Sequence, residues 1–169
     1  MSGKSPEISV GPDRCIPVHL LGVESTPTVG DMSGMNNDTA SMEEKVSVIL
    51  DTDIGDDIDD TWALAMLLKS PEVDLRMVVT DYDNTEWRAK IVAKMLEIAG
   101  RTDVPVGIGV KQSDNVGRQG PWVEDYDLST YPGTVHRDGV GAMIDEIMSS
   151  DGEITLLCIG PVPNIGEAL

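Results

Sequence analysis

Residues 46–68 constrain the fold of this chain most, because they lead from an apolar run directly into a dense group of aspartates and then into a second apolar segment. Residues 46–50 consist of valine, isoleucine and leucine with one serine, which is typical of a strand buried on both faces of a parallel sheet. Residues 61–69 are largely apolar and end before Ser70 and Pro71, as a helix does. The stretch therefore predicts a strand, an acidic turn and a helix.

The acidic turn carries far more negative charge than a solvated loop needs. It places six carboxylates within ten positions: Asp51, Asp53, Asp56, Asp57, Asp59 and Asp60. Ionised carboxylates so close together repel one another unless a counter-charge is present, and a hard cation with several oxygen ligands supplies one. The helix dipole also favours carboxylates at a helix start, which accounts for one or two of the six but not for all. We therefore predict that the turn binds a metal ion.

The overall charge and the cysteine content narrow the class of function. The chain has 169 residues, the size of one ordinary domain, and a formal net charge of −18. Such an acidic chain lacks the basic face that binding to nucleic acid or to an anionic membrane requires. Cys15 and Cys158 are too few for a disulfide framework, and no apolar run approaches the roughly 18 residues of a membrane span. A cytoplasmic protein is therefore expected.

The segment before the first strand differs from the rest in composition. Residues 1–44 are rich in Ser, Gly, Pro, Thr, Asp and Asn and show no sustained period, so a disordered tail is expected there. Residues 45–169 alternate strand-like and helix-like segments and form the expected domain. Further strands are predicted at 73–80, 104–110 and 153–159, and further helices at 87–99 and 140–149.

This alternation predicts an α/β domain with a mostly parallel, Rossmann-like sheet flanked by helices. In such sheets, ligands bind at the carboxyl ends of the strands. Polar residues follow three of the predicted strands, at 51–60, 81–84 and 160–164. Because the carboxyl ends of parallel strands meet at one edge of the sheet, we expect these turns to form a single site.

Four short motifs, in this order along the chain, resemble the inosine–uridine-preferring nucleoside hydrolase family. The family's D-x-D-P-G-x-D-D signature after its first strand is similar to residues 51–60. Its asparagine-bearing loop after the second strand is similar to residues 83–85, and its G-P-x-x-N-I turn is similar to residues 160–165. His136 and Gly139 resemble the family's His-Gly-x-x-Gly region.

The resemblance covers residues 46–169 and implies a calcium-dependent enzyme that hydrolyses the N-glycosidic bond of ribonucleosides to free base and ribose, as in purine and pyrimidine salvage. By position, Asp53 and Asp60 would bind Ca²⁺ through their carboxylates, and Ile159 would bind it through its backbone carbonyl. Asp53 would also accept the proton of the attacking water, in a reaction that passes through an oxocarbenium-like state. Asp53 is therefore the expected catalytic residue.

The resemblance assigns three other residues to the substrate. Asp59 would contact the ribose hydroxyls with Asn84 nearby, and His136 would lie in a mobile loop near the ribose. A plain loop histidine is an equally good interpretation of His136. The family commonly forms dimers and tetramers, so the resemblance also implies a homo-oligomer.

Departures from the family pattern leave alternatives open. Ile54 replaces the usual proline, and two extra residues separate Gly55 from the aspartate pair. The pair that matches the family is therefore either Asp59-Asp60, which the helix follows directly, or Asp56-Asp57. The family continues into a second half with further calcium and leaving-group residues, so the domain is expected to be incomplete at its C-terminus.

Other functions fit the acidic turn less well. An EF-hand is excluded, because the D-x-D-x-D/N-G spacing does not start at any of the aspartates. A Mg²⁺-dependent haloacid-dehalogenase-like phosphatase also carries Asp-x-Asp after a strand, but Thr80 is only a weak candidate for its later hydroxyl residue and no catalytic lysine is evident. A non-catalytic homologue that binds metal, sugar or a partner is the other alternative.

Overall fold

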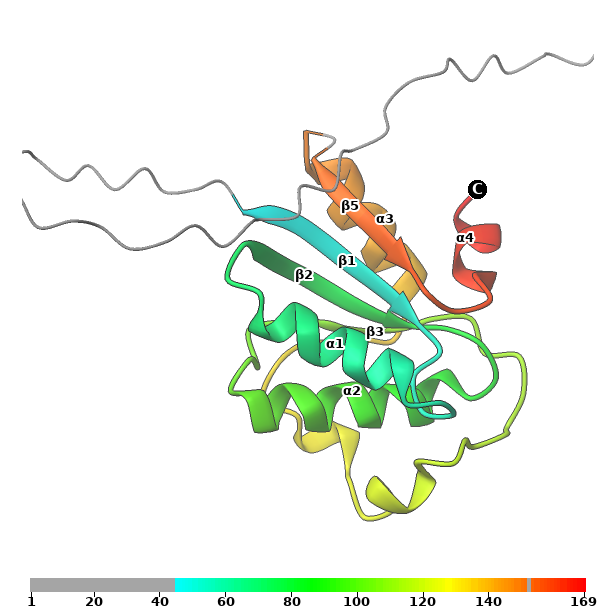
Figure 1. Cartoon of the computed structure of the whole chain (residues 1–169). Helices are drawn as coiled ribbons and strands as arrows, with labels where there is room; N and C mark the ends of the chain where they lie inside the picture. Colours follow the sequence, from blue (N-terminus) through cyan, green and yellow to red (C-terminus); the bar gives the residue numbers. More distant parts are fainter. Residues whose placement is uncertain (1–44, 152) are drawn as a thin grey trace, which may run out of the picture. The chain divides into compact units, whose positions relative to one another are not determined.

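The computed structural model describes residues 45–151 and 153–169, which form a five-stranded sheet with helices on both faces (Figure 1). The strands are β1 (Val46–Thr52), β2 (Val73–Thr80), β3 (Val106–Ile108), β4 (Val135–His136) and β5 (Ile154–Cys158). Their order is β4-β3-β2-β1-β5, and every pairing is parallel. The predicted parallel α/β sheet is confirmed, whereas the tail predicted at residues 1–44 lies outside the described residues.

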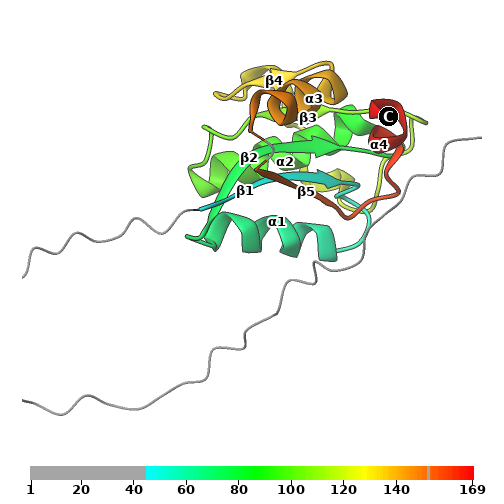
Figure 2. The ribbon, with the colours of Figure 1, turned by 90° about the horizontal axis from the view of Figure 1, so that it is seen from above.

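Two hydrophobic clusters flank the sheet, because alternate side chains of β1 point to opposite faces. Val48 and Leu50 pack with residues of α1 (Asp59–Lys69) and α2 (Thr85–Ala99), while Ile49 packs on the other face. That second face is covered by α3 (Gly139–Ser149) and α4 (Pro163–Ala168), and Figure 2 shows α1 and α3 on opposite sides of the sheet. The apolar run of β1 is thus buried on both sides from Val48 onward, as its sequence predicted, whereas Val46 is exposed.

Helix α2 begins and ends at residues of the types that commonly cap helices. Asn84 caps the N-terminus of α2, because its side chain accepts a hydrogen bond from Trp87 N at 3.1 Å. Gly100 ends the helix in the left-handed conformation, with φ 68°. These two residues thus define where α2 begins and ends.

Residues 111–134, which lack any period in sequence, contain two 3₁₀ turns, η1 (Gly120–Trp122) and η2 (Leu128–Thr130). The following strand β4 contains His136, so this residue pairs in the sheet and does not lie in a loop as predicted. The short pairing of His136 with Gly107 of β3 explains the difference, because two residues of strand are too few to leave a periodic signal.

Helix α1 buries only one side. Trp62 is 67% exposed and Met66 is 62% exposed, whereas Leu64 and Leu67 are buried. Apolar residues thus lie on all sides of α1, but within the described residues only one side of the helix is buried. None of the described helices is long and apolar enough to cross a membrane.

Candidate functional site

Three strand ends meet at one edge of the sheet, as expected. β1 ends with Asp51 and Thr52, Asp81 follows β2, and the turn between β5 and α4 contributes Val162 and Asn164. Val162 N donates to Asp81 Oδ2 at 3.0 Å, and Asn164 Nδ2 donates to Asp51 Oδ1 at 3.3 Å. These hydrogen bonds join segments 81 and 113 residues apart in sequence, so the rim is assembled by the tertiary fold.

Asp53 and Asp60 lie within electrostatic reach of each other in this rim. Asp53 is half-buried, and Asp60 is 9% exposed with its Oδ1 accepting from Thr52 Oγ1 at 2.6 Å. Burial raises the pKa of both carboxyl groups, and the charge of Asp53 raises the pKa of Asp60 further, against the effect of the Thr52 hydrogen bond. A cation close to both carboxylates would relieve this cost.

The predicted metal ligands form an all-oxygen set. Asp53 and Asp60 offer carboxylates, and Ile159 sits directly after β5, where its N–H donates to Asp51 O at 2.9 Å. Within residues 45–151 and 153–169, no three His, Cys, Asp or Glu side chains converge as metal ligands. Because Ca²⁺ takes about six to eight oxygens, these groups suit a hard cation but supply only part of its coordination sphere.

A second pair of carboxyl groups, on Asp51 and Asp81, is fully buried at the same rim. Among the described residues, Asp51 Oδ2 and Asp81 Oδ1 have no hydrogen-bond partner. Burial raises the pKa of Asp51 to about 7, with a further contribution from the charge of Asp81, and burial raises the pKa of Asp81 to about 6. In metal-free protein at about pH 6, the pair therefore holds a proton that exposed aspartates would have lost.

This pair makes the stability of the metal-free protein depend on pH. Because the pKa of Asp51 is about 7 in the folded protein and 3.8 for an ordinary aspartate, the folded state binds more protons between those values. The stabilisation is complete below the unfolded value and is lost as the pH rises through about 7. We expect the free energy of unfolding to fall by on the order of 2–3 kcal/mol between about pH 5 and about pH 8, measured by urea unfolding with a chelator present.

The variant Asp81→Asn is the control for this pH dependence. It keeps the shape of the side chain but removes one charge of the pair, so the loss of stability between the two pH values should become smaller but not disappear, because burial, the main cause of the raised pKa of Asp51, remains. General repulsion among the other carboxylates is unchanged in the variant. An equal slope in both proteins would show that the buried pair is not its source.

Asp59 and Asn84, the predicted ribose contacts, differ in their surroundings. Asp59 is exposed at the first position of α1, next to Asp60. Asn84 Oδ1 is engaged in capping α2, and its Nδ2 lies 3.5 Å from Asp114 O. Both residues follow the strand ends of the rim, so their assignment to the substrate stays a prediction that the turn geometry permits.

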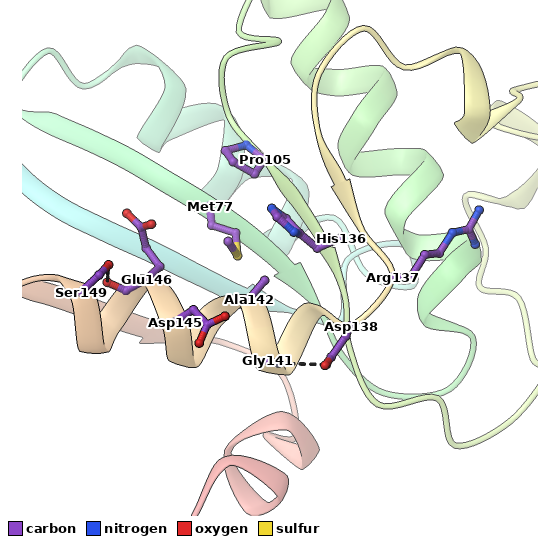
Figure 3. Close-up of a pocket in the computed structure, with 10 residues that line it drawn as sticks. All are labelled: Met77, Pro105, His136, Arg137, Asp138, Gly141, Ala142, Asp145, Glu146 and Ser149. Atoms are coloured by element: carbon purple, nitrogen blue, oxygen red, sulfur yellow. Dashed lines mark hydrogen bonds between the residues drawn. The ribbon is translucent and has the colours of Figure 1, made fainter.

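His136 lies in a different place from the aspartates of the rim. It lines a cavity of about 540 Å³ between the sheet and α3, and Figure 3 shows its ring directed toward Met77 and Pro105. The other side of the cavity is formed by α3, including Asp145 and Glu146. Asp53, Asp59 and Asp60 do not line this cavity, so the described structure does not bring His136 together with them.

Sequence reasoning missed two residues that hold the acidic turn. Gln119 N donates to Gly55 O at 2.9 Å, and its Nε2 donates to Asp57 O at 3.0 Å. Arg88 of α2 is 1% exposed and forms an ion pair with Asp56. Gln119 has no local signal in the sequence, but Arg88 stands three residues before Ile91 on the apolar face of α2, and that position is unusual for a charge.

Comparison with known proteins connects the chain to nucleoside hydrolases. The sequence model of the family described as inosine-uridine preferring nucleoside hydrolase matches residues 48–169. The chain is 30% identical over 138 residues to a probable uridine nucleosidase 2 of Arabidopsis thaliana, with 75% of this chain and 42% of that protein covered. It is 34% identical over 143 residues to a pyrimidine-specific ribonucleoside hydrolase of Escherichia coli, with the same two shares.

Solved structures give the same picture. A purine-preferring ribonucleoside hydrolase from Gardnerella vaginalis superimposes with a TM-score of 0.57 at 27% identity, over 73% of this chain and 43% of that chain. A plant nucleoside hydrolase superimposes with a TM-score of 0.55 at 31% identity, over 72% and 42%. The chain thus spans about two fifths of the length of the relatives it matches.

Proposed function

The chain belongs to the inosine-uridine preferring nucleoside hydrolase family, and from this premise we propose that it takes part in the calcium-dependent hydrolysis of ribonucleosides to free base and ribose. The observation that carries the proposal is the pairing of Asp53 with Asp60 at the carboxyl end of β1, where burial already raises the pKa of both carboxyl groups. The family match covers these residues.

Each residue of the proposed site has a distinct task. Asp53, Asp60 and the Ile159 carbonyl would hold Ca²⁺, which when bound orients the attacking water and lowers its pKa. Asp53 would accept the proton of that water, since a half-buried carboxylate with a raised pKa is the better base. The carboxylate of Asp59 would bind the ribose hydroxyls and stabilise the positive charge that develops on the sugar.

Calcium binding can be measured apart from catalysis. We expect Ca²⁺ at about 100 times its Kd to raise the free energy of unfolding by about 2.7 kcal/mol, and a chelator to reverse the change. Mg²⁺ at the same concentration should stabilise less, because it demands a rigid octahedral site and releases its waters reluctantly. Urea unfolding of the full chain with each ion tests this, and equal curves with and without Ca²⁺ would contradict the metal assignment.

The proposed reaction is tested by incubating the full chain with uridine or inosine and Ca²⁺, and measuring free base and reducing sugar together. Release of both in equal amounts supports hydrolysis. Calcium-dependent stabilisation without release would favour the second candidate, a non-catalytic homologue that binds metal or sugar. That candidate has support of its own, because the described donors fill only part of a calcium coordination sphere.

Family membership leaves the haloacid-dehalogenase-like phosphatase without support. The remaining expectations for the whole protein follow from the proposed function. They are a role in purine and pyrimidine salvage, a cytoplasmic location and assembly into a homo-oligomer. The base that is preferred stays open, since the relatives include uridine, pyrimidine-specific and purine-preferring enzymes.

A further inference from the structure

Arg88 is a fully buried cation beneath the acidic turn, near the start of α2. Its side chain is 1% exposed, and arginine is almost never buried to this extent unless it is paired. The ring of Trp87 lies 5.7 Å from its Cζ atom, which adds a cation–π contact. The surroundings of Arg88 therefore stabilise a buried positive charge.

The guanidinium donates to the backbone of two separate loops. Nη1 donates to Asp53 O and, at 2.8 Å, to Ile54 O, both in the turn after β1. Nε donates to Tyr82 O at 3.0 Å, in the turn after β2. Nη2 donates to Asp56 Oδ2 at 2.9 Å. One side chain thus joins the turns that follow the adjacent strands β1 and β2.

These contacts fix the peptide groups that carry the proposed catalytic carboxylate. The carbonyl of Asp53 and the carbonyl of Ile54 are both held toward Arg88, which sets the direction in which the Asp53 side chain leaves the turn. Tyr82 has φ 61°, a left-handed conformation that is uncommon outside glycine, and its carbonyl is held by the same group. Arginine suits this task because its planar fork offers five donors, whereas lysine offers a single compact ammonium group.

We propose that Arg88 is a positioning residue: its guanidinium fixes the turn after β1 so that Asp53 and Asp60 are preorganised for a divalent cation. The proposal rests on the proposed function for the identity of the ligands. Arg88 also places a positive charge near a cation site, which by itself opposes metal binding. Asp56 offsets that charge, and the hydrogen bonds face backbone carbonyls, so positioning outweighs repulsion.

The variant Arg88→Lys separates these two effects, because it keeps the charge and removes the fork. In metal-free protein, we expect the backbone amides of residues 53–60 to exchange with deuterium at least about tenfold faster, while amides of residues 139–149 exchange as in the wild type. The matched control is Arg76→Lys. Arg76 also forms ion pairs through its guanidinium group, with Asp74 and Glu146, but its side chain is exposed. Unchanged exchange at residues 53–60 in Arg88→Lys would overturn the proposal.

Calcium affinity gives the second readout, by titration calorimetry with CaCl₂. Residues that orient metal ligands typically change metal affinity about 10–100-fold, so Kd should rise at least about tenfold in Arg88→Lys and stay unchanged in Arg76→Lys. An equal or lower Kd in Arg88→Lys would refute the proposal. If the wild type binds no Ca²⁺, the proposed function fails, and the exchange experiment alone decides the role of Arg88.

A milder variant guards against loss of folding. Asp56→Asn weakens one of the four hydrogen bonds of the Arg88 guanidinium group. The Asp56 side chain is 44% exposed, so the substitution should be tolerated by the fold. We expect residues 53–60 to exchange about threefold faster in this variant, an intermediate effect, because charge-assisted hydrogen bonds are about twice as strong as neutral ones. No change at all in Asp56→Asn, together with an unfolded Arg88→Lys, would leave Arg88 a core residue only and overturn the positioning role.

Discussion

Under the proposed function, replacing Asp53 by asparagine is expected to lower kcat/KM for ribonucleoside hydrolysis at least about 10³-fold, because the proposed general base and metal ligand would be lost together. The fold should persist, since asparagine has the same shape and Asp53 is only half-buried at the end of the rim. Calcium affinity should fall as well. The measurement is release of base and ribose from uridine and inosine, with circular dichroism to check the fold.

Asp57→Asn is the matched control for this experiment. Asp57 lies in the same acidic turn, but its side chain is 78% exposed and lies 4.0 Å from Arg118. It carries the same charge, so a simple loss of negative potential would affect both variants alike. We expect activity within about twofold of the wild type in Asp57→Asn, as is usual for surface substitutions. Comparable losses in the two variants would remove Asp53 from the role of base.

Replacing Gly55 by alanine is expected to destabilise the protein by about 3 kcal/mol. Gly55 has φ 126°, a conformation that other residues rarely adopt. An added Cβ would lie 2.6 Å from Trp87 Cη2 and 2.8 Å from Ile91 Cδ1, so it would force the aromatic ring out of the core. Because these contacts join the turn to α2, calcium affinity should fall together with the free energy of unfolding measured in urea.

Gly100→Ala separates the backbone effect from the packing effect. Gly100 also has a positive φ, 68°, but nothing lies within 4 Å of an added Cβ. This variant should lose only about 1 kcal/mol, the cost of the left-handed conformation alone. Equal losses in the two variants would mean that the contact of Gly55 with Trp87 adds nothing.

The elements around the site were predictable because each has a strong local cause. The strand at 46–50 is continuously apolar, and it appears as β1 extended by Asp51 and Thr52. The extension was missed since aspartate disfavours strands in general, whereas here the rim buries Asp51 and bonds it to Asn164. The meeting of three strand ends was predicted by the parallel topology alone.

What the sequence did not reveal depends on long-range contacts. The density of aspartates in the acidic turn predicts a metal ion, but part of the counter-charge comes from Arg88, 32 residues beyond Asp56. The hydrogen bond to Asp81 comes from Val162, 81 residues away, and the hydrogen bond to Gly55 comes from Gln119, in a loop without periodicity. No window of local sequence contains these pairs, so pattern and spacing could not supply them.

The position of β1 between β2 and β5 has a consequence during synthesis. On the ribosome, the first of these strands emerges with its aspartates long before Asn164, the partner of Asp51 at a separation of 113 residues. At translation rates of about 5–20 residues per second, the nascent chain carries the unfinished rim for on the order of ten seconds. The hydrogen bond between Asn164 and Asp51 therefore forms only after the turn that follows β5 has been made.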